Sequence, residues 1–211
     1  MSRRIDRGRA AFAVFGCTCC APLAVGAEPQ HQAELTPMIG YRSGGSFEDP
    51  VDGSALDLDE GASQALIVNL DHDANTQWEI VYGRQDSQLN LVRAFQGRTQ
   101  VDVNVHQFSV GGIYVWRDAY AGVIPFVGAS IGATRLSPEG LDPATRPLLS
   151  FTAGYKFFLA DNIGARIEAR AYGTALETDS AIFCGNGACL ARVDSEGFWQ
   201  YEVNAGITLR F

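Results

Sequence analysis

The final fourteen residues of the chain, FWQYEVNAGITLRF (198–211), alternate strictly between two classes of side chain. From Trp199 to Phe211 every odd position is apolar or aromatic, and every even position is polar or glycine. A period of two is typical of a β-strand that has one apolar and one polar face. Such a strand turns its apolar face either to a protein core or to lipid, and the rest of the chain has to decide between the two.

Seven earlier segments alternate in the same way. They are residues 35–42, 61–70, 75–86, 103–116, 122–135, 148–158 and 163–174. Their lengths are roughly the 9–11 residues that a tilted membrane-spanning strand needs, and some are slightly longer. We therefore predict eight strands that share one kind of environment.

The connections between these segments alternate between long and short. Three are short and hold turn-forming residues: LDHDAN (70–75), RDAYA (117–121) and LADN (159–162). The other four are long: 43–61, 87–102, 136–147, and a stretch of about twenty residues around Cys184 and Cys189. Outer-membrane barrels have short periplasmic turns and long extracellular loops. The order of the connections favours a membrane barrel, with long loops outside and both termini in the periplasm.

The apolar face also favours lipid over a protein core. Its aromatic residues gather near the ends of segments, where a bilayer has its two interfaces: Tyr41, Tyr82, Trp116, Tyr155, Trp199 and Phe211. A soluble barrel would have to hold these side chains in a lumen that is wide enough for only one small ligand. Because lipid offers no hydrogen bonds, the sheet has to close on itself. The expected fold is all-β: a closed eight-stranded antiparallel up-and-down transmembrane β-barrel over residues 35–211.

The first 27 residues have the composition of a secretory signal peptide. Four arginines precede the apolar run AAFAVFGCTCCAPLAVGA, which closes on small residues. A lipoprotein signal at Cys17 is disfavoured because Phe15 is bulky where a small residue is needed. We expect cleavage after Ala27, and a short periplasmic lead-in at 28–34.

Charge excludes one class of partner. The chain has a net charge of −8. Removing residues 1–27 takes away four arginines and one aspartate, which leaves 12 basic and 23 acidic residues and a net charge of −11. Nucleic-acid binding needs a basic surface, so it is excluded. The remaining length suits one domain, and we expect a monomer.

Two cysteines, Cys184 and Cys189, remain after cleavage. An even number in an oxidising compartment predicts a disulfide that staples the last long loop. Zinc would need two more ligands, and the three histidines lie far away in the sequence.

The polar face of the strands carries charged residues of both signs. They are Glu79, Lys156, Arg166, Glu168, Arg170, Glu202 and Arg210, with Arg42 as a possible member. Since 163–174 and 198–211 are consecutive strands, Arg166, Glu168 and Arg170 are expected to face Glu202 and Arg210. We interpret the set as an ionic plug that fills the lumen. A narrow path for small solutes or protons, lined by the same charges, is the alternative.

Catalytic and metal-binding residues are not evident. His106 and Ser109 lie three positions apart, so a strand places them on opposite faces. A surface lipid enzyme therefore remains only a second alternative, and we expect no catalytic residue and no cofactor. The acidic loop with Glu48, Asp57 and Glu60 lacks the spacing of an EF-hand, which favours a solvated loop over a calcium site.

Three segments resemble the eight-stranded outer-membrane barrels of Gram-negative bacteria, of the OmpA/OmpX type. They are IPFVGASIGATR (124–135), KFFLADNIGARIEARAY (156–172) and YEVNAGITLRF (201–211). The resemblance implies that the barrel-assembly machinery reads the C-terminal strand and its Phe211. It also implies partners in outer-membrane lipid and lipopolysaccharide, and we expect no soluble peptidoglycan-binding domain after the barrel. The expected function is a structural or surface-interaction role through the long loops, because fold alone does not fix an activity.

Overall fold

The computed structural model describes residues 32–48, 55–95, 98–117, 122–176, 180–185, 188–193 and 197–211. The expected signal peptide at 1–27 and all but the end of the lead-in lie outside these ranges. No helix in the described part of the chain is long and apolar enough to cross a membrane.

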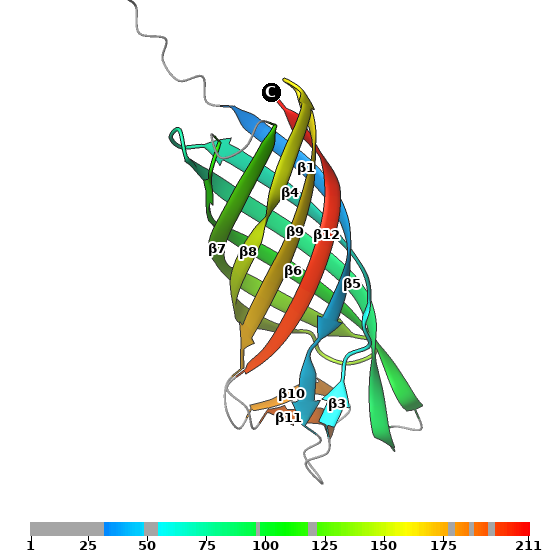
Figure 1. Ribbon diagram of the computed structural model, residues 1–211. Helices are drawn as coiled ribbons and strands as arrows, with labels where there is room; N and C mark the ends of the chain where they lie inside the picture. Colours follow the sequence, from blue (N-terminus) through cyan, green and yellow to red (C-terminus); the bar gives the residue numbers. More distant parts are fainter. Residues whose placement is uncertain are drawn as a thin grey trace, which may run out of the picture. The chain divides into compact units, whose positions relative to one another are not determined.

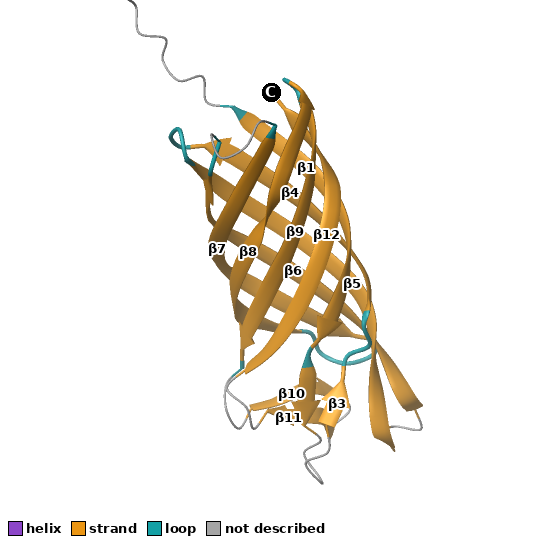
Figure 2. Ribbon diagram, in the orientation of Figure 1, coloured by secondary structure: helices purple, strands orange, loops and turns teal. Residues whose placement is uncertain are grey.

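Eight strands form a closed barrel in which every neighbouring pair is antiparallel (Figures 1 and 2). They are β1 (Ala33–Gly44), β4 (Gly61–Asp71), β5 (Thr76–Phe95), β6 (Arg98–Val115), β7 (Val123–Pro138), β8 (Ala144–Ala160), β9 (Ile163–Ala175) and β12 (Gly197–Arg210). Their order around the barrel follows the sequence, and β1 closes the sheet by pairing with both β4 and β12. The predicted closed, eight-stranded, up-and-down barrel is confirmed.

Four short strands form a second sheet, in the order β10 (Ser180–Gly185), β11 (Ala188–Val193), β2 (Ser46–Glu48) and β3 (Ala55–Asp57). Labels in Figure 1 show three of these strands, β3, β10 and β11, at the end of the barrel opposite the C-terminus. The sheet combines parts of the first and the last long connection, which were expected to be loops. The chain after β3 is attached to β5, because the Asp59 amide donates to the Gln88 carbonyl at 2.8 Å.

The long connection expected at 87–102 is largely strand, which corrects the sequence analysis. β5 continues to Phe95 and β6 begins at Arg98, so this segment is a hairpin that extends the barrel wall. β7 and β8 likewise extend into the expected loop 136–147. The period of two continues in these extensions, but with the opposite polarity.

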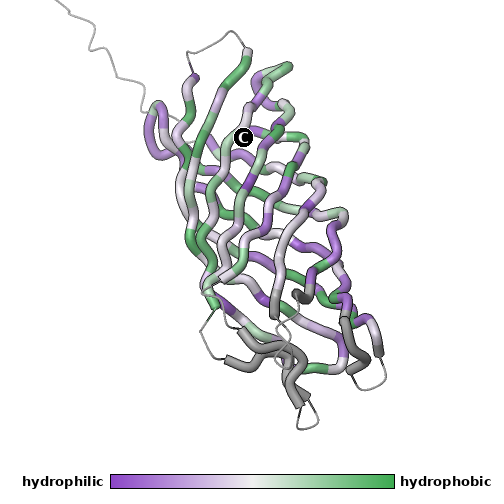
Figure 3. Tube along the Cα trace, turned by 60° about the horizontal axis from the view of Figure 1, so that its bottom comes forward, coloured by the Kyte–Doolittle hydropathy of each residue, from purple (hydrophilic) through white to green (hydrophobic). Residues whose placement is uncertain are grey.

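Side chains on the outside of the barrel are apolar over one band of the wall. On β12 the outward residues from Trp199 to Leu209 are all apolar and exposed, and Phe211 follows them. At about 3.3 Å per residue and a tilt of about 40°, the strand from Trp199 to Phe211 covers about 30 Å along the barrel axis. This length exceeds the ~25 Å apolar band of membrane barrels. Figure 3 shows hydrophobic and hydrophilic stretches interspersed along the barrel strands.

The outward polarity changes at one level of β5, β6 and β7. On β5 the exposed residues run from Trp78 and Tyr82 to Arg84, Asp86, Gln88 and Asn90. Inward residues change in the opposite sense, from Glu79 to the fully buried Leu89. The wall thus has a lipid-type pattern between this level and the end that holds the C-terminus, and a water-type pattern between this level and the opposite end. We call the first part the apolar belt and the second part the loop end, and we use 'above' for the direction toward the loop end.

The register fixes how far the strands tilt. A path of directly paired residues leaves β8 at Tyr155 and returns to β8 at Thr145, so the shear of the barrel is ten residues. The path runs through Ile167, Ala205, Ile39, Gln64, Arg84, His106 and Arg135. It climbs from the apolar belt to the loop end as it goes round the barrel.

Short turns join the strands at the end of the barrel that holds the C-terminus. In the turn between β4 and β5, Asp73 Oδ1 accepts hydrogen bonds from the amides of Asn75 and Thr76, both at 2.8 Å. At the same end the Phe211 amide donates to the Ala33 carbonyl at 2.9 Å, which brings the first and last strands together.

Candidate functional site: the barrel lumen

The structure places the seven charged residues of the predicted interior set on the inward face of the barrel. They are Glu79, Lys156, Arg166, Glu168, Arg170, Glu202 and Arg210. Arg42 and Glu34 join them, so that five cations and four carboxylates share the lumen. All but Arg210 are at most 3% exposed. The nine residues form three clusters along the lumen.

The central cluster is an alternating arrangement of two arginines and two glutamates. Arg166 Nη2 contacts Glu79 Oε2 at 2.7 Å and also binds Glu168. Arg170 Nη2 contacts Glu79 Oε1 at 2.8 Å, and its Nε donates to Glu168 Oε1 at 3.0 Å. Asn69 accepts from Arg166 Nη1 at 2.9 Å. Each carboxylate is bound by both guanidinium groups, which suits charges held away from water.

This cluster crosses the full width of the lumen. β9 carries Arg166 and Arg170, β5 carries Glu79, and the two strands are four steps apart in either direction round the eight-stranded barrel. They are therefore diametrically opposite. Side chains from opposite walls meet at hydrogen-bond distance, so the lumen is filled at this level.

The second cluster lies toward the loop end and contains Arg42, Tyr172 and Glu202. Arg42 Nη2 contacts Glu202 Oε1 at 2.8 Å, and the Tyr172 hydroxyl donates to Glu202 Oε2 at 2.9 Å. The Arg42 guanidinium also lies over the Tyr172 ring, 4.7 Å from its centroid. Glu202 faces Arg170 in the register of β9 and β12, as expected, but its carboxylate binds Arg42 of β1 rather than a charge of 163–174.

The third cluster lies toward the C-terminal end, around Glu34. Lys156 Nζ contacts Glu34 Oε2 at 2.5 Å and Gln77 Oε1 at 2.7 Å. Arg210 Nη2 contacts Glu34 Oε1 at 2.9 Å. Arg210 was also expected to face residues 163–174, but its ion-pair partner is Glu34 of β1. Glu34 was assigned to the lead-in by the sequence analysis, whereas β1 begins at Ala33.

Amides and hydroxyls fill the space between the charged clusters. Gln107 Nε2 donates to Gln200 Oε1 at 3.3 Å across the lumen, and Thr134 and Thr174 share a hydrogen bond of 2.9 Å. A chain of three serines, Ser109, Ser130 and Ser150, is joined by hydrogen bonds of 2.9 and 2.6 Å. These residues were not predicted as site residues, although the period of two, which sets them opposite outward apolar residues on each strand, marked them as inward.

An apolar layer closes the lumen at the loop end. Its buried members are Leu58, Leu89, Val101, Val103, Val105, Leu136, Leu176 and Phe198. They come from β5, β6, β7, the ends of β9 and β12, and the segment after β3. Leu58 reaches this layer from the first long connection and forms a bridge with Leu89 of β5. The layer is an ordinary hydrophobic core. It was not predicted, because most of its residues, such as Leu89 and Leu136, lie in segments that were expected to be loops.

The structure also places the other residues that the sequence singled out. His106 points outward and shares a 2.9 Å hydrogen bond with Tyr82, whereas Ser109 is buried in the lumen. The two therefore lie on opposite faces, as expected. Phe211 is 74% exposed at the end of the apolar belt.

The structure tests the cysteine and acidic-loop predictions only in part. The register of β10 and β11 sets Cys184 opposite Cys189, and the disulfide itself stays a prediction. Parts of the acidic loop, including Asp49 and Asp52, lie outside the described residues. Within the described ranges, no group of three or more His, Cys, Asp or Glu residues could hold a metal ion.

Comparison with known proteins gives the class of fold. No protein-family model matches the sequence, and no curated protein matches it either. Among solved structures, the Neisserial surface protein NspA is similar with a TM-score of 0.58 and 14% identity, over 85% of this chain and 97% of NspA. OprG, an outer-membrane protein from Pseudomonas aeruginosa, has a TM-score of 0.58 and 8% identity, over 86% of this chain and 96% of OprG. The chain has the fold of the eight-stranded outer-membrane β-barrels, as its resemblance to the OmpA/OmpX type implied.

Proposed function

We propose that the protein is an integral outer-membrane barrel with a closed lumen, which acts through its outer surface rather than as a channel. The observation that carries this proposal is the double seal of the lumen. Ion pairs join opposite walls within the apolar belt, and an apolar layer fills the barrel at the loop end. A structural or surface-interaction role fits a barrel that passes no solute.

The physical argument rests on what an ion path requires. A permeating ion needs water or polar ligands that it can exchange along its route. Arg166 and Arg170 are instead bound to Glu79 and Glu168 on both sides, and all four are at most 3% exposed. Above them, Leu89 and Val105 are fully buried against other apolar side chains. An ion would therefore have to break paired charges and then cross a dry layer.

The proposed orientation puts the loop end outside the cell and both termini in the periplasm. It is supported by the short turns at the end where Phe211 and Ala33 meet. It is also supported by the second sheet, β10-β11-β2-β3, which belongs to the long connections. NspA is named as a surface protein, which agrees with a role at the external face. Exposed carboxylates such as Asp59 and Glu60 lie in the first of these connections.

The test is single-channel conductance of the refolded mature protein in a planar bilayer. The shift in gel mobility between heated and unheated samples serves as the control for folding. We expect folded protein with no steady openings. Steady openings from folded protein would refute the closed lumen, and substitutions at Glu79 and Arg166 would then be expected to change the conductance.

A further inference from the structure

Three basic side chains form a row on the outer wall, directly beside one another on β5, β6 and β7. The register pairs Arg84 with His106 and His106 with Arg135. All three stand on the outward face of their strands. Each lies two residues beyond an outward residue of the apolar belt, namely Tyr82, Phe108 and Ala133. The row therefore marks the upper edge of the belt, where lipid headgroups would lie. We call these three residues the basic row.

The side chains of the basic row remain available to an anion. Arg84 binds Asp86 through Nε at 3.1 Å and Nη2 at 2.9 Å, but the two side chains are 50% and 67% exposed, so water screens the pair and an anion can compete with Asp86 for Arg84. Arg84 Nη1 and the whole Arg135 side chain have no partner among the residues that the structure describes. His106 is held against the wall by its hydrogen bond to the Tyr82 hydroxyl.

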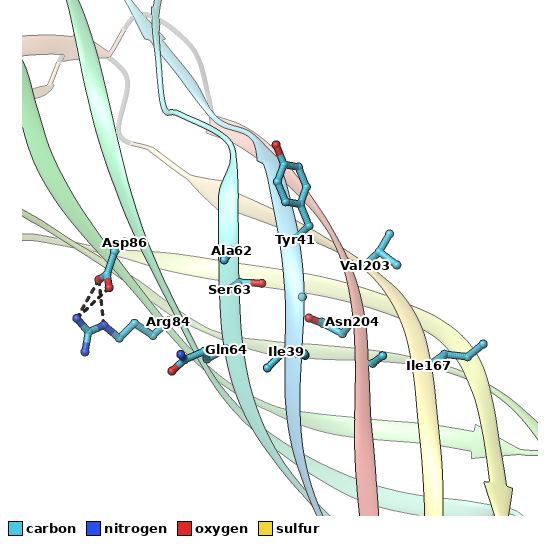
Figure 4. Close-up of a pocket in the computed structure, with 12 residues that line it drawn as sticks. Ile39, Tyr41, Ala62, Ser63, Gln64, Arg84, Asp86, Ile167, Val203 and Asn204 are labelled. Carbon is cyan, nitrogen blue, oxygen red and sulfur yellow. Dashed lines mark hydrogen bonds and ion pairs between the residues drawn. The ribbon is translucent and has the colours of Figure 1, made fainter.

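An apolar groove on the outer wall adjoins the basic row (Figure 4). It has a volume of about 1000 Å³ and lies over β1, β4, β5, β9 and β12. Its floor consists of small residues, Gly40, Ala62 and Ala205, and larger apolar side chains such as Ile39 border it. Arg84 and Asp86 form one of its edges. Figure 4 shows these two side chains on the strand beside Ala62 and Gln64.

We propose that this part of the wall binds one molecule of lipopolysaccharide, with the phosphates of its lipid A on the basic row and an acyl chain in the groove. The inference rests on the proposed orientation, in which the loop end faces the outer leaflet. Adjacent strands are about 4.8 Å apart, so Arg84 and Arg135 are separated by about 10 Å across the wall. That spacing suits the two phosphates of lipid A better than the single phosphate of a phospholipid. Guanidinium groups bind phosphate through charge-assisted hydrogen bonds.

The test is a binding titration of the refolded protein in zwitterionic detergent with purified deep-rough lipopolysaccharide, followed by the thermal unfolding midpoint. A ligand that binds the folded state raises this midpoint as its concentration increases. The test variant carries Arg84→Gln and Arg135→Gln. The matched control is Arg117→Gln, which removes an arginine at the opposite end of the barrel. We expect the apparent Kd to rise about tenfold or more in the test variant, and to stay unchanged in the control.

A second pair of variants tests the groove while all cations are kept. Ala62→Trp fills the floor of the groove, whereas Ala165→Trp adds the same side chain elsewhere on the outer wall. Weaker lipopolysaccharide binding by Ala62→Trp alone supports the proposed acyl-chain position. Equal binding by both tryptophan variants and the wild type overturns it. If the double arginine variant does not fold, Arg135→Gln alone provides the test of the basic row.

A comparison of two lipids in the same titration tests whether the ligand is lipopolysaccharide. Phosphatidylglycerol that binds as tightly as lipopolysaccharide, through the same arginines, would overturn the assignment to lipopolysaccharide. Unchanged binding of lipopolysaccharide by the double arginine variant would overturn the basic row as the site. These results are independent of the lumen, because conductance of the same variants tests the closed barrel separately.

Discussion

Removal of Arg170 tests whether the ionic network stabilises the barrel. In the variant Arg170→Leu, Glu79 and Glu168 lose one guanidinium each and share Arg166. Breaking a buried ion pair by removing one partner costs about 3–5 kcal/mol. Because Arg166 still binds both carboxylates, we expect a loss in the free energy of unfolding at the lower end, about 3 kcal/mol.

A second substitution in the same cluster makes the prediction more specific. Adding Glu79→Gln to Arg170→Leu leaves one guanidinium, Arg166, facing one carboxylate, Glu168. The double variant should therefore be more stable than Arg170→Leu alone, by about 1–2 kcal/mol, within the usual range for coupled neighbours. Glu79→Gln by itself leaves two guanidinium groups on one carboxylate. A guanidinium group cannot release its proton, so this single variant should be destabilised at least as much as Arg170→Leu.

Urea unfolding in detergent measures these differences, with gel mobility as the probe of the folded barrel. A loss of about 3 kcal/mol lowers the unfolding midpoint by about 1–3 M urea at typical slopes. The matched control is Arg84→Gln, which removes a guanidinium from an exposed pair and should cost at most about 1 kcal/mol. The reasoning would be refuted if Arg170→Leu unfolded at the same urea concentration as Arg84→Gln. It would also fail if the double variant lost as much as the two single losses added together.

Three further predictions concern other parts of the barrel. Leu89→Ala in the apolar layer should lower the free energy of unfolding by about 2–5 kcal/mol, measured by urea unfolding, because the side chain is fully buried. Gly132→Ala should cost about 1–3 kcal/mol, since its Cβ would lie 1.9 Å from a backbone oxygen, whereas Gly112→Ala has 3.5 Å and should be nearly neutral in the same assay. Hydrogen bonds from the Thr76 hydroxyl and nearby amides hold the pKa of the Asp73 carboxyl below its usual value. The resulting stabilisation is present above the ordinary pKa of aspartate and is lost as pH falls through the lowered value, so the difference in urea midpoint between wild type and Asp73→Asn should shrink in acid.

The barrel could be predicted from the sequence because lipid imposes a simple rule on the strands. Each outward residue within the belt must be apolar, so a period of two appears on every strand, as from Trp199 to Phe211. Strand number and order followed from counting these segments. The same rule does not apply at the loop end, so the strands there were not predicted. Above Tyr82 the wall faces water, and the apolar residues of the alternation, such as Leu89 and Val103, change to the inside. An analysis that looks for one apolar face assigns this stretch to a loop.

Partners within the lumen were harder to predict than membership in it. Parity along a strand decides which residues point inward, and it selected Glu79, Arg166 and Arg170 correctly as inward residues. It cannot decide which of them meet, because contacts across a lumen depend on the shear and on strands that are far apart in the sequence. Glu79 and Arg166 are 87 positions apart and lie on opposite walls.

Contact across the barrel also explains why ionic residues are suited to this position. Eight tilted strands leave a lumen that is just wide enough for side chains to fill, so long side chains from opposite walls can reach one another there. Charges of opposite sign, such as Arg166 and Glu79, fill that space and satisfy one another without water. At the loop end the outer surface is already polar, so an apolar interior around Leu89 gives the larger gain from burial. The change from an ionic to an apolar interior therefore follows from the change of solvent outside. On β5, β6 and β7 the outward residues Arg84, His106 and Arg135 lie where the wall changes from apolar to polar.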